Sequence, residues 1–188
     1  MSMKEPPSRD KCKRTVYAVI YGVGPETLAS QLGPEVSPSQ AAAMLTSFGK
    51  RFPAIGKLRN NVVEQCRKVG YTQTLLGRRR HFGAGTIKST DYSKRTAAER
   101  QCFNHVLQGS AADVVKVAMI RAQERLHSRK LNARLVLQIH DELVVECATA
   151  HVGQCAAELA AAMQTAVQLS LPLPVVVKQG DSLGSLED

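Results

Sequence analysis

Aromatic residues are scarce in this sequence of 188 residues, which has four Tyr, four Phe and no Trp. Ala, Val and Leu dominate the apolar residues instead, a composition that favours helices over an all-β sandwich. Hydrophobic residues still make up 44% of the chain, which is typical of a folded globular protein and excludes the disordered and fibrous classes. The length suits one ordinary domain or two small lobes that share a core.

The sequence also lacks a C-x-x-C pair and a signal peptide, which leaves no basis for a zinc ribbon or a disulfide framework. Its cysteines are odd in number: Cys12, Cys66, Cys102, Cys147 and Cys155. The longest uncharged run, 159–177, contains two prolines and two glutamines, so we interpret it as a helix followed by a strand. These absences predict an intracellular protein with reduced thiols and no membrane span.

Charge is distributed unevenly along the chain. Residues 1–100 hold 18 Lys and Arg against 7 Asp and Glu, whereas residues 101–188 hold 7 against 9. A basic surface attracts polyanions, and a surface that bears carboxylates attracts divalent metal ions. Nucleic acid together with a metal ion is therefore the leading hypothesis, although an ordinary solvated surface explains the charge equally well.

Periodicity and turn residues predict a mostly helical α+β protein. Helices are expected over residues 9–21, up to residue 32, and over 38–50, 53–69, 94–107, 111–129 and 149–169. Ser110 and Thr149 are the expected caps of the last two helices. Strands are expected over 71–76, 134–139, 143–147 and 174–179, with a basic turn at 77–80, a loop over 81–93 and a hairpin tip at 140–142.

Cationic and aromatic side chains recur at every fourth position near the N-terminus, at Arg9, Lys13, Tyr17 and Tyr21. At about 100° per residue each step drifts by only about 40°, so a helix keeps all four on one side over about 18 Å. Such a row can grip a triphosphate with its cations while a ring covers the sugar and the base. By spacing alone, a solvated edge beside half-buried tyrosines is the commoner interpretation.

Four motifs in a fixed order make the sequence recognisable. The row of four continues into Gly22 and is followed by Gly77-Arg78-Arg79-Arg80, by Glu99-Arg100-x3-Asn104-x3-Gln108-Gly109-Ser110 and by Gln138-Ile139-His140-Asp141-Glu142-Leu143. In this order and with these spacings they resemble the family A DNA polymerases, the DNA polymerase I group. The resemblance implies an N-terminal tail over 1–8, a basic, helical fingers-like lobe over 9–95 and a partial palm with the His-Asp-Glu hairpin over 96–188.

The resemblance implies a DNA-directed DNA polymerase that transfers nucleotides from a dNTP to a primer 3′ end, in DNA repair or replication. Arg9 and Lys13 would contact the phosphates of the incoming nucleotide, and Tyr17 would stack on its sugar and base. Tyr21 would lie near the templating base. These contacts meet the need of phosphoryl transfer for positioning and charge neutralisation.

The same resemblance assigns the hairpin tip to catalysis. Asp141 would bind the catalytic Mg²⁺ ions, with Glu142 beside it and His140 near the primer end. A two-metal mechanism needs carboxylates held at a rigid point, and a hairpin tip supplies one. Taken alone, the three residues are an ordinary polar turn.

Primer–template DNA is the remaining partner that the resemblance implies. Arg100, Asn104 and Gln108 fall on one helical face and would contact DNA near the primer–template junction, although a polar helix edge is the plain alternative. Arg78 and its two neighbours would contact phosphates or form structural ion pairs, and the sequence leaves both open. Asp113 is expected to be a helix cap.

One motif of the family is not found in this sequence. The family's other catalytic aspartate lies in a D-x-S-x-x-E motif upstream of the fingers helix, and Asp91-Tyr92-Ser93 only imitates its start, since Glu99 stands eight residues on. We therefore expect a fragment or a divergent product that is inactive alone and whose partners include the missing N-terminal polymerase regions. A non-catalytic remnant that binds DNA or a protein partner is the alternative. A third hypothesis is a small metal-dependent nuclease that uses Asp141 and Glu142. It fits the charge and the carboxylates, but it gives no role to the row from Arg9 to Tyr21.

Two features bear on the branch of the family. Arg14 stands where bacterial members usually have a small residue, and the connection from Arg121 to Arg134 is short. The arginine is similar to the eukaryotic nu and theta branch, and the short connection lacks the long insertion of theta, so the chain resembles nu better than theta. A nuclear location is expected if the protein is eukaryotic, and a cytoplasmic one otherwise.

Overall fold

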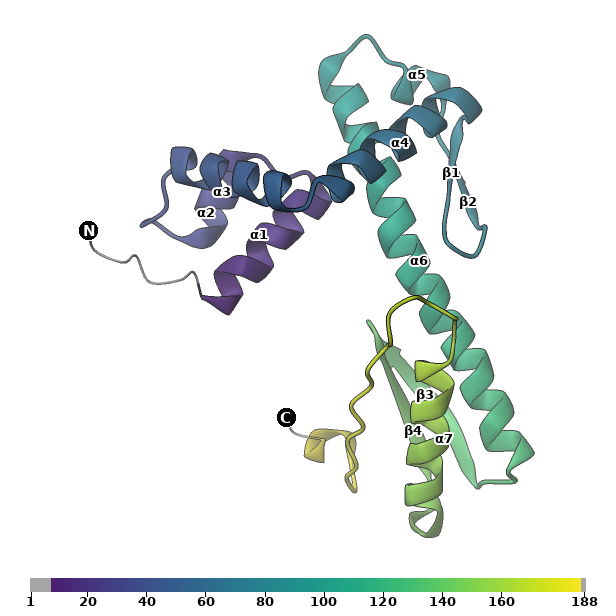
Figure 1. Cartoon of the computed structure of the whole chain (residues 1–188). Coiled ribbons are helices and arrows are strands. Elements are labelled where there is room, and N and C mark those ends of the chain that lie inside the picture. The colour runs from purple at the N-terminus through teal and green to yellow at the C-terminus, as the bar shows by residue number, and fades with distance from the viewer. Residues whose placement is uncertain (1–7, 187–188) are drawn as a thin grey trace. The chain divides into compact units, whose positions relative to one another are not determined.

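The computed structural model describes residues 8–186 (Figure 1). The elements are α1 (Arg9–Tyr21), α2 (Pro25–Leu32), α3 (Pro38–Arg51), α4 (Pro53–Val69), β1 (Tyr71–Gln73), β2 (Arg79–His81), α5 (Ala84–Ile87), α6 (Tyr92–Ser128), β3 (Ala133–Ile139), β4 (Glu142–Cys147), η1 (Thr149–His151), α7 (Val152–Gln164) and η2 (Leu183–Ser185). The strands form two antiparallel pairs, β1 with β2 and β3 with β4. This mostly helical fold with small sheets confirms the predicted class.

The chain divides into two compact units between Gly109 and Ser110. Unit 1 is the part up to Gly109, and unit 2 is the part from Ser110 onward. No charged residue lies between 101 and 109, so the units inherit the charge division of the sequence, +11 for unit 1 and −2 for unit 2. The functional division into fingers and palm lobes at residues 95 and 96 stays a prediction.

The first three helices share an aliphatic core in unit 1. Leu28 is fully buried, and Ala18, Leu32 and Ala41 pack with it. Each helix begins where its local sequence provides a start: Ser37, for example, accepts a hydrogen bond from the Gln40 backbone N–H (3.3 Å), and the Gln40 side chain accepts one from the Ser37 N–H (2.8 Å). This core fixes which side of α1 faces solvent.

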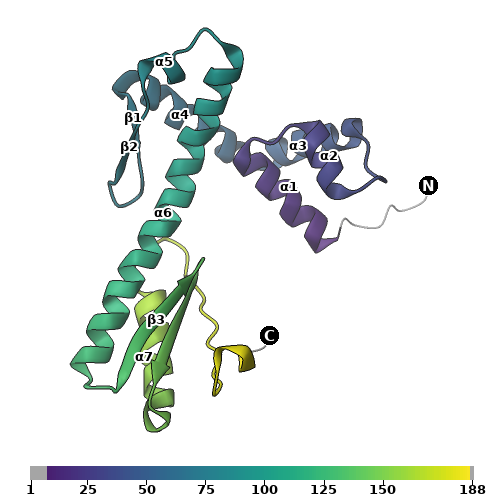
Figure 2. The same ribbon diagram turned by 180° about the vertical axis from the view of Figure 1, so that it is seen from behind.

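A second core in unit 1 lies between α4, α5 and the first part of α6, and it includes Phe82, the residue after β2. Its fully buried members include Cys66 and Cys102, whose Sγ atoms are 3.3 Å apart. Burial raises the pKa of both thiols. Both cysteines are free, as the sequence predicts. The hairpin runs beside α6 in both of the opposite views, Figure 1 and Figure 2.

The prediction of two helices over 94–107 and 111–129 is wrong, because α6 is one helix of 37 residues. Gly109 and Ser110 resemble a stop and a new cap in the sequence, yet both lie buried inside the helix. Asp113, the expected cap residue, is also buried in the helix interior. The real cap is Asp91, whose carboxylate accepts hydrogen bonds from the backbone N–H groups of Ser93 (2.8 Å) and residue 94 (3.1 Å).

The region from 71 to 93 holds more regular structure than the sequence predicts. The expected strand over 71–76 ends at Gln73, and the expected basic turn supplies β2, with Tyr71 opposite His81 in the register. The hairpin turns back at Gly77, whose φ of 86° lies in the left-handed region that favours glycine. The expected loop over 81–93 contains α5 and the start of α6.

Unit 2 packs the second part of α6 against the β3–β4 hairpin and α7, which confirms the predicted hairpin. Buried Ala118, Leu143 and Ala166 form its apolar core. The Glu158 carboxylate on α7 accepts hydrogen bonds from the guanidinium groups of Arg125 in α6 and of Arg129 just after the end of α6, at 2.7 and 2.9 Å. This ion cluster joins the two helices.

Two predicted elements near the C-terminus are corrected. The helix expected to reach 169 ends at Gln164, because Thr165 caps it by donating its hydroxyl hydrogen to the Ala161 carbonyl (2.7 Å). Thr149, the expected cap, opens a short 3₁₀ turn instead. The expected strand over 174–179 has no strand partner among the described residues, and Val176 is 85% exposed. No described helix is both long enough and apolar enough to cross a bilayer.

Leu28→Ala should lower the free energy of unfolding by about 2–5 kcal/mol, because it leaves a cavity in the core that orients α1. Leu171→Ala is the control, since Leu171 is 75% exposed and its truncation should change stability by no more than about 0.5 kcal/mol. Urea unfolding of both variants measures the difference. Equal losses would mean that Leu28 does not lie in a packed core.

Candidate nucleotide and nucleic-acid interface

Helix α1 presents the row of four predicted nucleotide-binding residues to solvent. Arg9, Lys13, Tyr17 and Tyr21 are all exposed, the two tyrosines by 46% and 36%. The opposite side of the helix carries buried residues such as Ala18, which packs into the first core of unit 1. The predicted one-sided row is therefore present, and it is available to a ligand.

The cations of α1 fall into two groups. Lys11 pairs with Glu35 at 3.0 Å, and Arg14 pairs with Asp10 at 2.8 Å. A backbone hydrogen bond, together with Lys11, lowers the pKa of Glu35. Within the described residues, the two cations of the exposed row, Arg9 and Lys13, form no ion pair.

The aromatic rings extend the row along the helix. The Lys13 Nζ atom lies 5.8 Å from the centroid of the Tyr17 ring, and the Tyr17 and Tyr21 ring centroids are 6.0 Å apart. The row therefore runs without interruption from a cation to a pair of rings, as a ligand with phosphates at one end and a flat base at the other requires.

The end of α1 lies against the predicted DNA-binding face of α6. Gln108 Nε2 donates a hydrogen bond to the Tyr21 hydroxyl oxygen over 3.0 Å. A Cβ atom at Gly22 would lie 3.0 Å from Cγ of Arg100, so the arginine stem packs directly on this glycine. The structure thus brings residues of the two predicted rows together within unit 1.

Asn104, the middle residue of the α6 row, is less accessible than Arg100 and Gln108. Arg100 and Gln108 are exposed, whereas Asn104 is half-buried and its Oδ1 atom has no hydrogen-bond partner in the described part of the chain. This oxygen is itself buried, so the structure does not present it to a ligand. A role of Asn104 in DNA binding stays a prediction.

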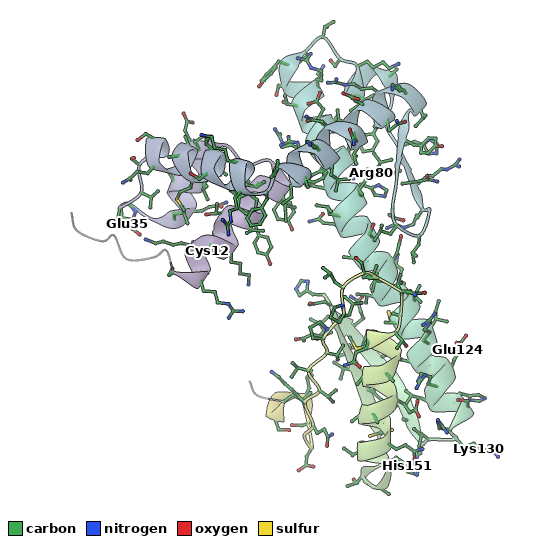
Figure 3. All side chains as sticks on the ribbon, viewed as in Figure 1. Cys12, Glu35, Arg80, Glu124, Lys130 and His151 are labelled. Atoms are coloured by element: carbon green, nitrogen blue, oxygen red, sulfur yellow. The ribbon has the colours of Figure 1, made fainter. Side chains whose placement is uncertain are left out.

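The structure gives the arginines of the β1–β2 hairpin definite intramolecular contacts. Arg78 Nη2 donates to the Gly109 carbonyl at 3.0 Å. The Arg80 guanidinium lies over the Phe82 ring at 5.1 Å and donates to Gln101 Oε1 at 2.8 Å (labelled Arg80 in Figure 3). These contacts favour the structural interpretation of Arg78 and Arg80 that the sequence leaves open, and a role of Arg78 in DNA binding stays a prediction.

Two contacts that position the hairpin are not predicted from the sequence. The Thr72 hydroxyl and His105 Nδ1 form a buried hydrogen bond of 2.7 Å between β1 and α6. Gly109 permits the close approach of the hairpin, because a Cβ there would lie 2.8 Å from Cγ2 of Thr74. The Gly109-Ser110 pair was visible in the sequence, but it was interpreted as a helix break.

The predicted catalytic residues of unit 2 lie at the tip of the β3–β4 hairpin. Ile139 pairs with Glu142, so His140 and Asp141 form a two-residue connection. His140 has φ 54°, and its carbonyl accepts a hydrogen bond from the Gln138 side chain. All three predicted residues at the tip are exposed.

Asp141 and Glu142 fit an open magnesium site better than an enclosed one. Among residues 8–186 no cluster of three or more His, Cys, Asp and Glu side chains could hold a metal ion. Mg²⁺, however, is usually bound by one or two carboxylates, with water and substrate phosphates as the other ligands. Neither carboxylate is in an ion pair within the described part of the chain.

Comparison with known protein families identifies the chain. The model of DNA polymerase family A matches residues 2–185. The chain belongs to DNA polymerase family A. Membership explains why four separated motifs occur in one order.

Two bacterial proteins are similar to the chain over almost all of its length. The chain is 37% identical to DNA polymerase I of Treponema pallidum (strain Nichols) and 39% identical to DNA polymerase I of Mycobacterium leprae (strain TN), each over 180 residues. The matches cover 96% of this chain but only 18% and 19% of those proteins. These relatives give no support to the predicted nu branch, and Arg14 has a local role in its ion pair with Asp10.

A solved family structure has the same fold. It is the POL domain of Pol1 from M. smegmatis in complex with DNA primer-template and dNTP. The match has a TM-score of 0.86 and 36% sequence identity, and it covers 95% of this chain and 31% of that chain. The chain is thus similar to about a third of a polymerase domain that binds both predicted ligands.

Gly109→Ala should destabilise the chain by about 1–3 kcal/mol, because the new methyl group overlaps Thr74 and pushes the hairpin away from α6. Gly56→Ala is the matched control in the same unit, since Gly56 lies in α4 with open space around it and alanine should add about 0.5–1 kcal/mol. The measurement is the free energy of unfolding of each variant relative to the unmodified chain, and the loss should be larger for Gly109→Ala. A gain in stability at both positions would refute the close packing at Gly109.

Proposed function

We propose that this chain is the C-terminal part of a template-directed DNA polymerase, which transfers a nucleotide from a dNTP to a primer 3′ end. One observation carries the proposal: the exposed row of α1 contacts the α6 row through the Tyr21–Gln108 hydrogen bond. We call Arg9, Lys13, Tyr17 and Tyr21 the nucleotide row, and Arg100, Asn104 and Gln108 the DNA row. Template-directed synthesis requires that nucleotide-binding and DNA-binding residues lie next to each other. The solved family structure with DNA and dNTP supports both ligands.

The residues of unit 1 bind and orient the substrates. Arg9 and Lys13 neutralise the triphosphate, and the Tyr17 ring covers the sugar and base. Arg100 contacts DNA phosphates, whereas the amides of Asn104 and Gln108 reach base edges or sugars. Positioning and charge neutralisation supply most of the catalysis in phosphoryl transfer.

Unit 2 contributes the carboxylates. Asp141, with Glu142 beside it, would hold Mg²⁺, which lowers the barrier by neutralising charge on the attacking and leaving oxygens. His140 lies next to them at the hairpin tip, and the resemblance to the family implies that it acts near the primer end. The two-residue connection keeps all three side chains at the end of a paired ladder, which restricts their movement.

DNA binding by the 188-residue chain should be salt-sensitive and indifferent to sequence, because Lys and Arg in unit 1 meet phosphates. Arg100→Ala should weaken DNA binding at least about threefold. It should also make the slope of log K against log salt shallower, by roughly the contribution of one phosphate contact. Fluorescence anisotropy with a labelled primer–template measures both.

Arg134→Ala is the matched control for this experiment. It removes the same charge from unit 2, where Arg134 pairs with Glu146 on the exposed hairpin. If both variants weaken binding equally, the α6 row is no DNA site. If the unmodified chain does not bind at low salt, the DNA-binding part of the proposal fails.

Nucleotide binding separates the polymerase from the alternative, a DNA-binding remnant without catalysis. Lys13→Ala should weaken the binding of Mg²⁺–dNTP to the chain on primer–template about tenfold or more, through the loss of a charge-assisted contact. Lys11→Ala on the same helix should leave it unchanged, because Glu35 already holds Lys11. Calorimetric titration with a non-hydrolysable dNTP distinguishes them. DNA binding without nucleotide binding would favour the remnant.

A further inference from the structure

Two side chains assigned to different substrates meet in unit 1. Tyr21 belongs to the nucleotide row and Gln108 to the DNA row, and they share the hydrogen bond of 3.0 Å between Gln108 Nε2 and the Tyr21 hydroxyl oxygen. We propose that Tyr21 is a positioning residue for DNA, whose hydroxyl holds the Gln108 amide toward the primer–template. This inference rests on the proposed function.

The chemistry of the amide makes this arrangement useful. A glutamine amide has two N–H donors and one carbonyl acceptor. The bond to Tyr21 uses one N–H, so the second N–H and the carbonyl stay available to a base edge or a sugar. A held amide also has less rotational freedom to lose when DNA binds, which lowers the entropic cost of that contact.

The backbone at the end of α1 fixes the position of the hydroxyl. Gly22 caps the helix with φ 66°, in the left-handed region that favours glycine. Its lack of a Cβ atom lets the Arg100 stem pack on it, at a place where a methyl carbon would come within 3.0 Å of Arg100 Cγ. Tyr21 is therefore anchored next to α6 by its neighbour as well as by its own hydroxyl.

The ring stack supports the Tyr21 side chain from the other side. The Tyr17 and Tyr21 centroids are 6.0 Å apart with planes tilted by 46°, and Tyr21 is only 36% exposed. A ring restrained by a neighbouring ring presents its hydroxyl in few orientations. The Gln108 side chain, by contrast, is long, exposed and without a second hydrogen bond in the described residues, so Tyr21 orients Gln108 rather than the reverse.

A double-mutant cycle on the full chain tests the proposal. Tyr21→Phe removes the hydroxyl and keeps the ring, and Gln108→Met keeps the side-chain length without the amide. Each should weaken binding of a fluorescent primer–template roughly three- to tenfold, as expected for one lost hydrogen bond that orients another. The double variant should bind no more weakly than Gln108→Met, because Tyr21 acts on DNA only through Gln108.

The control variant is Tyr92→Phe, which removes a phenolic hydroxyl from a ring that is 72% exposed and lies over Arg95 at the start of α6. It should leave the affinity for primer–template unchanged. The salt slope supplies a second readout. It should be the same for wild type and all variants, because neither Tyr21 nor Gln108 carries charge, whereas a distorted unit 1 would lose phosphate contacts and give a shallower slope.

The outcomes separate this inference from the proposed function. Losses that multiply in the double variant would show that the two residues act independently and would overturn the positioning role, as would full affinity in Tyr21→Phe. Wild-type binding would remain in both cases, so the proposed function would stand. Absence of wild-type binding at low salt would overturn the DNA-binding part of the proposed function and the positioning role together.

Discussion

The close packing of other elements on helix α6 is the constraint on which both units depend. In unit 1, α6 supplies the buried Cys102, the His105 partner of Thr72 and the glycine on which the hairpin rests. In unit 2 it supplies Ala118 to the apolar core and Arg125, one of the two arginines that hold Glu158. A break at Gly109 would therefore disturb more than the local helix. The 37-residue length of α6 follows from this packing on both parts, because intrinsic helix propensity alone would not carry a helix through Gly109-Ser110.

The same helix explains why structural and functional arginines lie so close together. Arg78 donates a hydrogen bond to the Gly109 carbonyl, and Arg80 donates one to the Gln101 side chain. These charge-assisted hydrogen bonds hold the hairpin to α6. Arg100 packs its stem on Gly22 and keeps its charged end in solvent. Some cations of the positive unit 1 thus hold its elements together, and others stay exposed to solvent. Formal charge alone cannot separate these two groups.

The α1 helix shows this division most clearly. Lys11 and Arg14 point toward acidic partners at Glu35 and Asp10, and the intervening Lys13 lies beside a ring on the exposed face. Three cations within four positions therefore have three different environments. Helical geometry produces this result, since each successive residue turns by about 100° around the axis. The face that the first core leaves exposed is the one that carries Arg9, Lys13, Tyr17 and Tyr21.

The sequence by itself determined most of the helix limits, the β3–β4 hairpin and the family, because caps, turn residues and ordered motifs are local features that a chain displays without its fold. It could not determine that Gly109-Ser110 lies inside one helix, since only the hairpin packed on that glycine shows why a residue without a Cβ is required there. The same holds for β2, which depends on its pairing with β1. The cap at Asp91 and the end of α7 rest on local hydrogen bonds, but they differ from the limits expected from the sequence. The sequence placed Tyr21 and Gln108 in separate rows, 87 positions apart. Only the tertiary structure brought them within hydrogen-bonding distance, because no local pattern encodes which distant side chains will meet.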